Sequence, residues 1–149
     1  MTVIDLGHVN LWVGDLDRSA AFYRDVLGFA EVARGVLKGR RIAFFTLGAR
    51  HHDLALVELS NAAPFTAARL GLNHIGLKVG DRLDHLRTLR DRLIEQGIAP
   101  HHYVEHRVCQ SMHVDDPDGN TIELYVDADP ALWAHDPQAI VYSEPLQLD

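Results

Sequence analysis

The sequence has a single cysteine among 149 residues and lacks both long apolar runs and clusters of basic residues. One thiol cannot form an intramolecular disulfide or a cysteine-rich zinc site, so a bound metal would need nitrogen and oxygen ligands. No apolar stretch approaches the roughly 20 residues of a membrane span. The first residues, Met1–Asp5, show no basic region leading into an apolar one, as an export signal would. We therefore expect a cytoplasmic protein.

The charge balance points away from nucleic acid. Lys and Arg number 14 against 21 Asp and Glu, for a formal charge of -7, and no basic stripe is present. Apolar residues make up 47% and charged residues 23%, which is typical of a globular domain. The length suits one domain. We expect a small-molecule partner, with no nucleic acid and no membrane, and the ten histidines are the excess to explain.

The chain repeats itself. Residues 8–15, HVNLWVGD, return as HIGLKVGD at residues 74–81, an offset of 66. Residues 57–59, VEL, return as IEL at residues 122–124, an offset of 65. Two matches at nearly one offset predict a duplicated half-domain of about 65 residues.

Each half is predicted to have the order β-α-β-β-β, which gives an α+β fold. The opening segments alternate as strands do. The first helix has an aspartate as its expected cap and a glycine after its end, and the second has leucines along one side and ends at a glycine. The expected helices are 17–27 and 82–96, and the later strands are 30–36, 41–48, 53–60, 99–105, 109–114 and 121–127. The expected organisation is one domain over 1–128 (module 1 about 3–60, linker 61–71, module 2 about 72–127) and an irregular tail, 129–149.

Strand alternation predicts four polar side chains opposite the apolar face: His8, Glu58, His74 and Glu123. Imidazoles and carboxylates are ligands that Zn, Ni, Mn and Fe accept. Two His/Glu pairs at repeat-related positions therefore predict a divalent-metal site. The alternative is that these are ordinary hydrogen-bonded or solvated strand residues.

Three motifs resemble the vicinal oxygen chelate superfamily: the opening at His8, the segment Phe22–Phe29 (FYRDVLGF), and the segment Asp116–Tyr125 (DPDGNTIELY). That superfamily includes glyoxalase I, type I extradiol dioxygenases, and fosfomycin- and bleomycin-resistance proteins. The resemblance covers roughly residues 3–127. It implies two tandem modules whose curved mixed sheet forms a cup around a divalent metal, commonly within a homodimer.

Within the superfamily, the ring-cleaving dioxygenases imply a ligand set of His8, His74 and Glu123 around Fe(II), or around Mn(II). Such a facial triad leaves positions open for a catecholate and O2. The His52-Asp53 pair resembles the element in which these enzymes carry an acid/base histidine.

Further site candidates follow from the same resemblance. His106 resembles the substrate-side histidine of the second module, and His52 or His106 would carry the proton. His113 stands where these enzymes often have a tyrosine, about ten residues before the last ligand. Tyr125 shares the face of Glu123 and would hydrogen-bond the substrate or line the cup.

Two other functions remain open. A glyoxalase-like lyase or isomerase would use Glu58 as a fourth ligand to Ni(II) or Zn(II) and would transfer a proton next to a carbonyl. A metal-free member would sequester a drug, as bleomycin-resistance proteins do. The motif His51-His52-Asp53 favours the dioxygenase.

Overall fold

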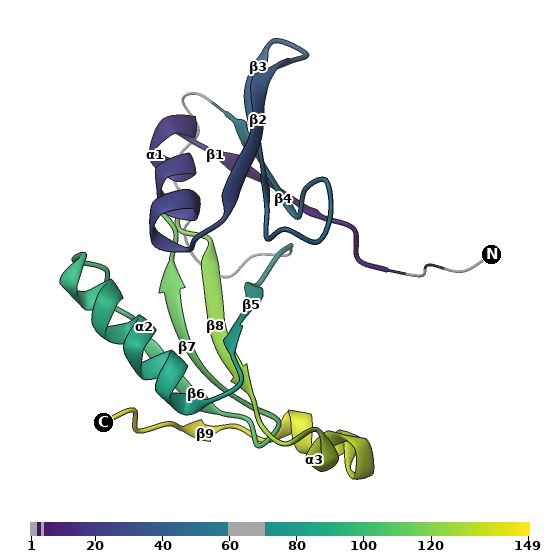
Figure 1. Ribbon diagram of the computed structural model, residues 1–149, viewed down its shortest axis with the longest axis vertical. Coiled ribbons are helices and arrows are strands. Elements are labelled where there is room, and N and C mark those ends of the chain that lie inside the picture. The colour runs from purple at the N-terminus through teal and green to yellow at the C-terminus, as the bar shows by residue number, and fades with distance from the viewer. Residues whose placement is uncertain (1–2, 4, 60–70) are drawn as a thin grey trace. The chain divides into compact units, whose positions relative to one another are not determined.

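The computed structural model describes residues 3, 5–59 and 71–149, and the chain divides into two units (Figure 1). The first unit is Met1–Thr66 with Pro117–Gly119, and the second is Ala67–Asp116 with Asn120–Asp149. The expected linker, 61–71, lies outside the described residues except for its last position. Each unit contains one mixed sheet that does not close into a barrel, so the α+β expectation is confirmed.

The first unit has the predicted order β-α-β-β-β. Its elements are β1 (Val9–Val13), α1 (Leu16–Ala21) with a π-helical turn (Phe22–Val26), β2 (Ala30–Leu37), β3 (Arg40–Thr46) and β4 (Leu54–Glu58). The sheet order is β1-β4-β3-β2, in which β1 and β4 are parallel and the other pairs antiparallel. The side chain of Asp15 caps α1 by accepting a hydrogen bond from the Arg18 amide.

The second unit repeats this order and adds to it. Its elements are β5 (Ile75–Gly80), α2 (Leu83–Glu95), β6 (His102–Glu105), β7 (Cys109–Asp115) and β8 (Thr121–Asp127). The sheet order is β5-β8-β7-β6-β9, with β5 and β8 parallel. The expectation of an irregular tail is wrong, because residues 129–149 form α3 (Pro130–His135), a 3-10 helix (Pro137–Val141) and β9 (Glu144–Pro145), which pairs with β6.

One face of each sheet is buried against its helix. In the first unit, Glu58 contacts the first turn of α1, which places the even-numbered residues of β4 on the helix side. In the second unit, Leu86 and Leu93 of α2 are fully buried. The sheet residues that share these cores are Leu11, Val13, Phe45, Leu54, Leu56, Met112, Val114, Ile122, Leu124 and Val126. The opposite faces carry both polar and apolar side chains, among them His8, Val57 and Glu123. None of the helices in the described residues has the length and apolarity needed to cross a membrane.

The two parallel strand pairs show which positions correspond between the units. Asn10 pairs with Ala55 in the first unit, and Gly76 pairs with Glu123 in the second. Asn10 and Gly76 are 66 residues apart, which is the repeat offset found in the sequence. The structural counterpart of Glu123 is therefore Ala55. The VEL/IEL match had instead suggested Glu58.

The predicted face of Glu58 is also wrong. Glu58 pairs with Val13, whose side chain is buried on the helix side of the sheet. Paired residues of neighbouring strands point to the same side, so Glu58 faces α1. His8 lies two residues before Asn10 and shares its face of the sheet, which is the face opposite α1.

Candidate metal centre

His74 and Glu123 come together on the open face of the second sheet. His74 directly precedes β5, and Glu123 lies in the middle of β8. The Nε2 atom of His74 is 3.3 Å from an Oε atom of Glu123. The carboxylate side chain is 14% exposed and the imidazole 38% exposed, so the pair is shielded on one side and accessible on the other.

The hydrogen bond on the far side of the His74 ring shows what this pair can bind. Nδ1 of His74 lies 2.7 Å from the side-chain oxygen of Asn73, so Nδ1 carries the proton and donates it. In the neutral ring, Nε2 then directs a lone pair toward the Glu123 carboxylate. In that form, the Nε2 lone pair and the carboxylate oxygen are both acceptors, and a cation between them would bind to both.

The spacing also suits one metal ion. Two ligands about 2.1 Å from a common ion lie roughly 3.0–3.4 Å apart at octahedral or tetrahedral angles. The observed 3.3 Å falls in that range. A hydrogen bond that fixes the outer nitrogen is the usual support of a metal-binding histidine. The arrangement of Asn73, His74 and Glu123 is therefore one in which His74 and Glu123 could hold a divalent ion.

His113 of β7 borders the pair. It is the cross-strand partner of Glu123, and its ring centre is 5.6 Å from that of His74. Its Nδ1 atom is buried without a hydrogen-bond partner. Burial lowers the pKa of His113 below its usual value, against the opposing influence of Glu123, and this favours the neutral ring. A neutral imidazole can accept a proton, and Nδ1 would reach a bound ligand only if the side chains that cover it moved.

Tyr125 follows two residues after Glu123 and lies on the same face. Burial raises the pKa of its hydroxyl, and Asp127 acts in the same direction. The hydroxyl therefore stays protonated and can donate a hydrogen bond at neutral pH. The described geometry thus brings together four predicted residues of the second unit: His74, Glu123, His113 and Tyr125.

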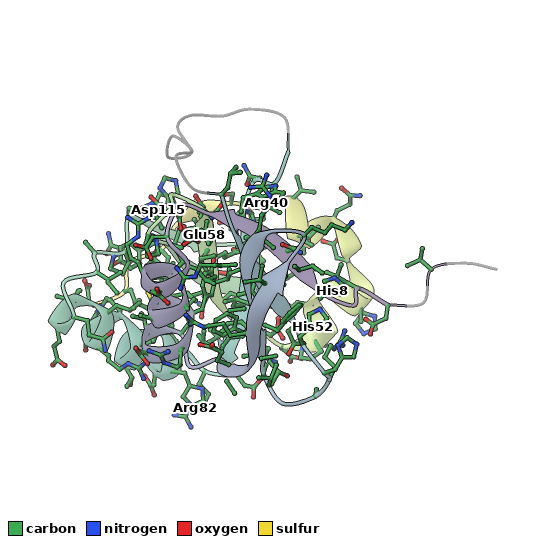
Figure 2. The ribbon with its side chains drawn as sticks, turned by 90° about the horizontal axis from the view of Figure 1, so that it is seen from above. His8, Arg40, His52, Glu58, Arg82 and Asp115 are labelled. Carbon is green, nitrogen blue, oxygen red and sulfur yellow. The ribbon has the colours of Figure 1, made fainter. Side chains whose placement is uncertain are left out.

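His8 and His52 form a separate cluster in the first unit (Figure 2). Their ring centres are 4.4 Å apart, and the His52 ring also meets Phe44 edge-on at 5.2 Å. Burial lowers the pKa of His52, as does the neighbouring His8. Asp53 does not orient His52 by a hydrogen bond, because its carboxylate accepts one from the Leu47 amide and fixes the loop.

Glu58 lies away from this cluster (Figure 2). One carboxylate oxygen accepts a hydrogen bond from the Leu16 amide at 3.0 Å and another from Arg41 at 3.1 Å. The first of these contacts is a helix cap, since the amides of the first turn have no partner within the helix. In the structure Glu58 therefore stabilises the start of α1.

His106 lies in the hairpin between β6 and β7. Its Nδ1 atom is 2.8 Å from the backbone oxygen of Tyr142, which belongs to the C-terminal segment. The carbonyl can only accept, so Nδ1 carries a proton and Nε2 is free to accept one. The contact orients the ring, and Tyr142 is in turn held by Arg107, whose guanidinium carbon lies 3.9 Å from the centre of the Tyr142 ring.

Within the described part of either unit, no three His, Cys, Asp or Glu side chains form a complete ligand group. Of the predicted ligands, His8 belongs to the first unit, and His74 and Glu123 belong to the second. The residue that the sequence prediction missed is Asn73. Its position directly before a candidate ligand was the available signal, because histidine ligands need a hydrogen-bond acceptor on the second nitrogen.

Comparison with known proteins identifies a matching family and similar enzymes. Residues 5–124 match the family described as the Glyoxalase/Bleomycin resistance protein/Dioxygenase superfamily. The catechol-2,3-dioxygenase of Bacillus subtilis (strain 168) is 34% identical over 132 residues, which are 88% of this chain and 44% of that protein. The biphenyl-2,3-diol 1,2-dioxygenase 3 of Rhodococcus globerulus is 34% identical over 127 residues, 82% of this chain and 63% of that protein.

Comparison with solved structures finds the same fold in a member of this superfamily. A crystal structure of a glyoxylase/bleomycin resistance protein/dioxygenase domain from Frankia sp. EAN1pec superposes with a TM-score of 0.73 at 25% identity, covering 85% of this chain and all of that one. The chain spans less than two thirds of the length of the two curated dioxygenases.

Proposed function

Because the chain belongs to the glyoxalase/bleomycin resistance protein/dioxygenase superfamily, we propose that it is a divalent-metal enzyme that opens the ring of a small catechol-like aromatic. The observation that carries the proposal is the His74/Glu123 pair, in which Nε2 and a carboxylate oxygen lie 3.3 Å apart while Nδ1 is held by the side chain of Asn73. The similarity to two diol dioxygenases supports the choice of substrate class.

The proposed ligands are His8, His74 and Glu123. The first rests on the family pattern, and the other two rest also on their geometry. Fe(II) is the proposed ion, with Mn(II) as the substitute; held by such a triad, it would offer positions for the oxygens of a diol and for O2. Ala55 at the position equivalent to Glu123 supports three protein ligands rather than four.

The chain's own residues would manage the protons of the diol. Burial favours the neutral form of His113, and its Nδ1 has no hydrogen-bond partner among the described residues, so His113 is a candidate acceptor for a hydroxyl proton next to Glu123. His52 and His106 are the further acid/base candidates, since each has a defined ring contact and His106 has a fixed tautomer. The Tyr125 hydroxyl would donate a hydrogen bond to a substrate oxygen.

The test combines metal analysis with a coloured product. Protein purified without chelator should retain divalent metal, and after anaerobic Fe(II) loading it should turn simple catechols yellow. The variants Glu123→Gln and His74→Ala should lose metal and activity together. Glu95→Gln, at the exposed end of α2, is the matched control and should keep both.

Other results would redirect the assignment. A chain that binds no divalent metal would be a binding protein of the superfamily, and the enzyme proposal would be wrong. A metal-bound chain that leaves every catechol intact but turns over a hemithioacetal with Ni(II) or Zn(II) would be a glyoxalase-like enzyme.

A further inference from the structure

The open face of the first sheet carries an exposed aromatic ring beside a cation. Trp12 of β1 is 58% exposed. The guanidinium carbon of Arg40, the first residue of β3, lies 5.4 Å from the centre of the Trp12 ring. Both belong to the face opposite α1, since Trp12 pairs with Val57, and Val57 pairs with Ile42, two residues after Arg40.

Arg40 differs from its neighbour in having no anionic partner in the part of the chain that the structure describes. Arg41 points to the helix side, where it pairs with Asp17 at 2.7 Å and with Glu58 at 3.1 Å. Across the described residues, no carboxylate lies within ion-pairing distance of Arg40. Its contact with the Trp12 ring offers no hydrogen-bond acceptor, so the guanidinium N–H groups remain available.

The surface next to Trp12 is apolar and partly open. The row of paired residues that crosses the sheet from Trp12 contains Val57, Ile42 and Gly35. Val57 is half-buried and Ile42 is buried, and a side chain built on Gly35 would meet nothing within 4 Å. A flat apolar group can therefore pack on the exposed Trp12 ring beside the half-buried Val57 and bring an attached anion to Arg40.

The distance from the proposed ligand His8 limits what can reach this position. His8, Asn10 and Trp12 are every second residue along the strand and share one face. His8 and Trp12 are four residues apart, so their backbones are about 13 Å apart at 3.3 Å per residue. A single ring held at His8 is too short, whereas two linked rings can span it. We propose that Trp12 and Arg40 form a subsite for a second, carboxylate-bearing ring of the substrate. The choice of a diol at the other end rests on the proposed function.

Binding of two matched probes to the full chain without added metal tests the subsite. Biphenyl-4-carboxylate and biphenyl-4-carboxamide have the same shape and differ in charge. At low ionic strength the wild type should prefer the carboxylate about three- to tenfold, as expected for a partly exposed ion pair with directed hydrogen bonds. Arg40→Gln should remove the preference and leave amide binding unchanged. Trp12→Leu should weaken the binding of both probes.

Arg41→Gln is the matched control, because it removes the same charge from the adjacent residue on the other face. It should keep the preference. Equal affinity of the two probes for the wild type, or equal losses in the two arginine variants, would overturn the proposal. So would an Arg40→Gln variant that changes only self-association in sedimentation, since the face would then be a contact between copies of the chain.

The binding test is independent of ring cleavage. An Arg40-dependent preference in a chain that cleaves no catechol would leave the subsite standing and refute the proposed reaction. Cleavage of catechol by a chain with no preference between the probes would refute the subsite alone.

Discussion

Replacing Glu58 distinguishes a three-ligand metal site from a four-ligand one. In the structure its carboxylate caps α1 through the Leu16 amide and contacts Arg41, and its side chain is 15% exposed. If this is its role, Glu58→Ala lowers the free energy of unfolding and leaves the metal content unchanged. If Glu58 is a ligand, the metal content falls.

The magnitude follows from the contacts that are lost. A hydrogen bond from an amide to a charged acceptor contributes about 1.5 kcal/mol. The favourable interaction of a carboxylate with a helix N-terminus adds about 0.5 kcal/mol. The partly exposed ion pair with Arg41 adds about 0.5 kcal/mol. Glu58→Ala should therefore destabilise the chain by about 2–3 kcal/mol. Glu58→Gln keeps an acceptor oxygen for the Leu16 amide and should cost about 1 kcal/mol.

Urea denaturation followed by circular dichroism gives the stability, and elemental analysis of the same preparations gives the metal. Glu123→Gln serves as the paired variant, and it should show the opposite pattern: metal lost, with a smaller change in stability. The remaining cap of α1, Asp15, keeps the helix from unravelling in the Glu58 variants. Glu58 variants that lose metal at unchanged stability would refute the assignment of this residue to the helix cap.

Three further predictions concern other parts of the chain. Asp118 accepts hydrogen bonds from the fully buried Ser19 hydroxyl and from two further donors, so Asp118→Ala should cost about 3 kcal/mol in urea denaturation. In a double-mutant cycle with Ser19→Ala the effects should overlap, and strict additivity would contradict the contact. Burial and nearby carboxylates raise the pKa of the Cys109 thiol to about 11. At pH 8, iodoacetamide should therefore alkylate Cys109 about a hundredfold more slowly in the native chain than in urea. The alkylation rate of the native chain should rise as the pH approaches that pKa. Equal rates in the two states would contradict this. Deleting residues 142–149 removes the carbonyl that holds Nδ1 of His106, so nitrogen NMR of the deletion variant should show a mixture of His106 tautomers. The control Tyr142→Phe keeps this carbonyl and should not change the spectrum. An unchanged spectrum in the deletion variant would show that the contact does not select the tautomer.

The fold was predictable because its signals are local. Strand alternation and helix boundaries depend on neighbouring residues, and the repeat at His8 and His74 placed β1 and β5 at equivalent positions. The face of Glu58 was not predictable from the repeat, since the VEL/IEL match is three residues out of register with the strand pairing. Register depends on the partner strand, and a one-residue shift reverses every side chain.

The C-terminal segment was misjudged for a different reason. Its prolines were interpreted as breaks, yet Pro130 and Pro137 each begin a helix. Proline suits the first position of a helix because no amide is needed there. The aspartates directly before them, Asp129 and Asp136, cap those helices with their side chains. The Asp-Pro pairs were a readable signal for two helix starts.

The corrected register changes the chemistry expected of the proposed site. The duplicated scaffold places a histidine at each first strand, but only the second unit has a carboxylate at the matching position, where the first has Ala55. Two neutral imidazoles and one carboxylate around a divalent ion leave a net charge of +1, whereas a fourth, carboxylate ligand would cancel it. A site with that net charge and unfilled positions would suit a diol that binds as an anion. The single alanine in β4 therefore favours oxygen-donor substrates over the four-ligand proton-transfer chemistry.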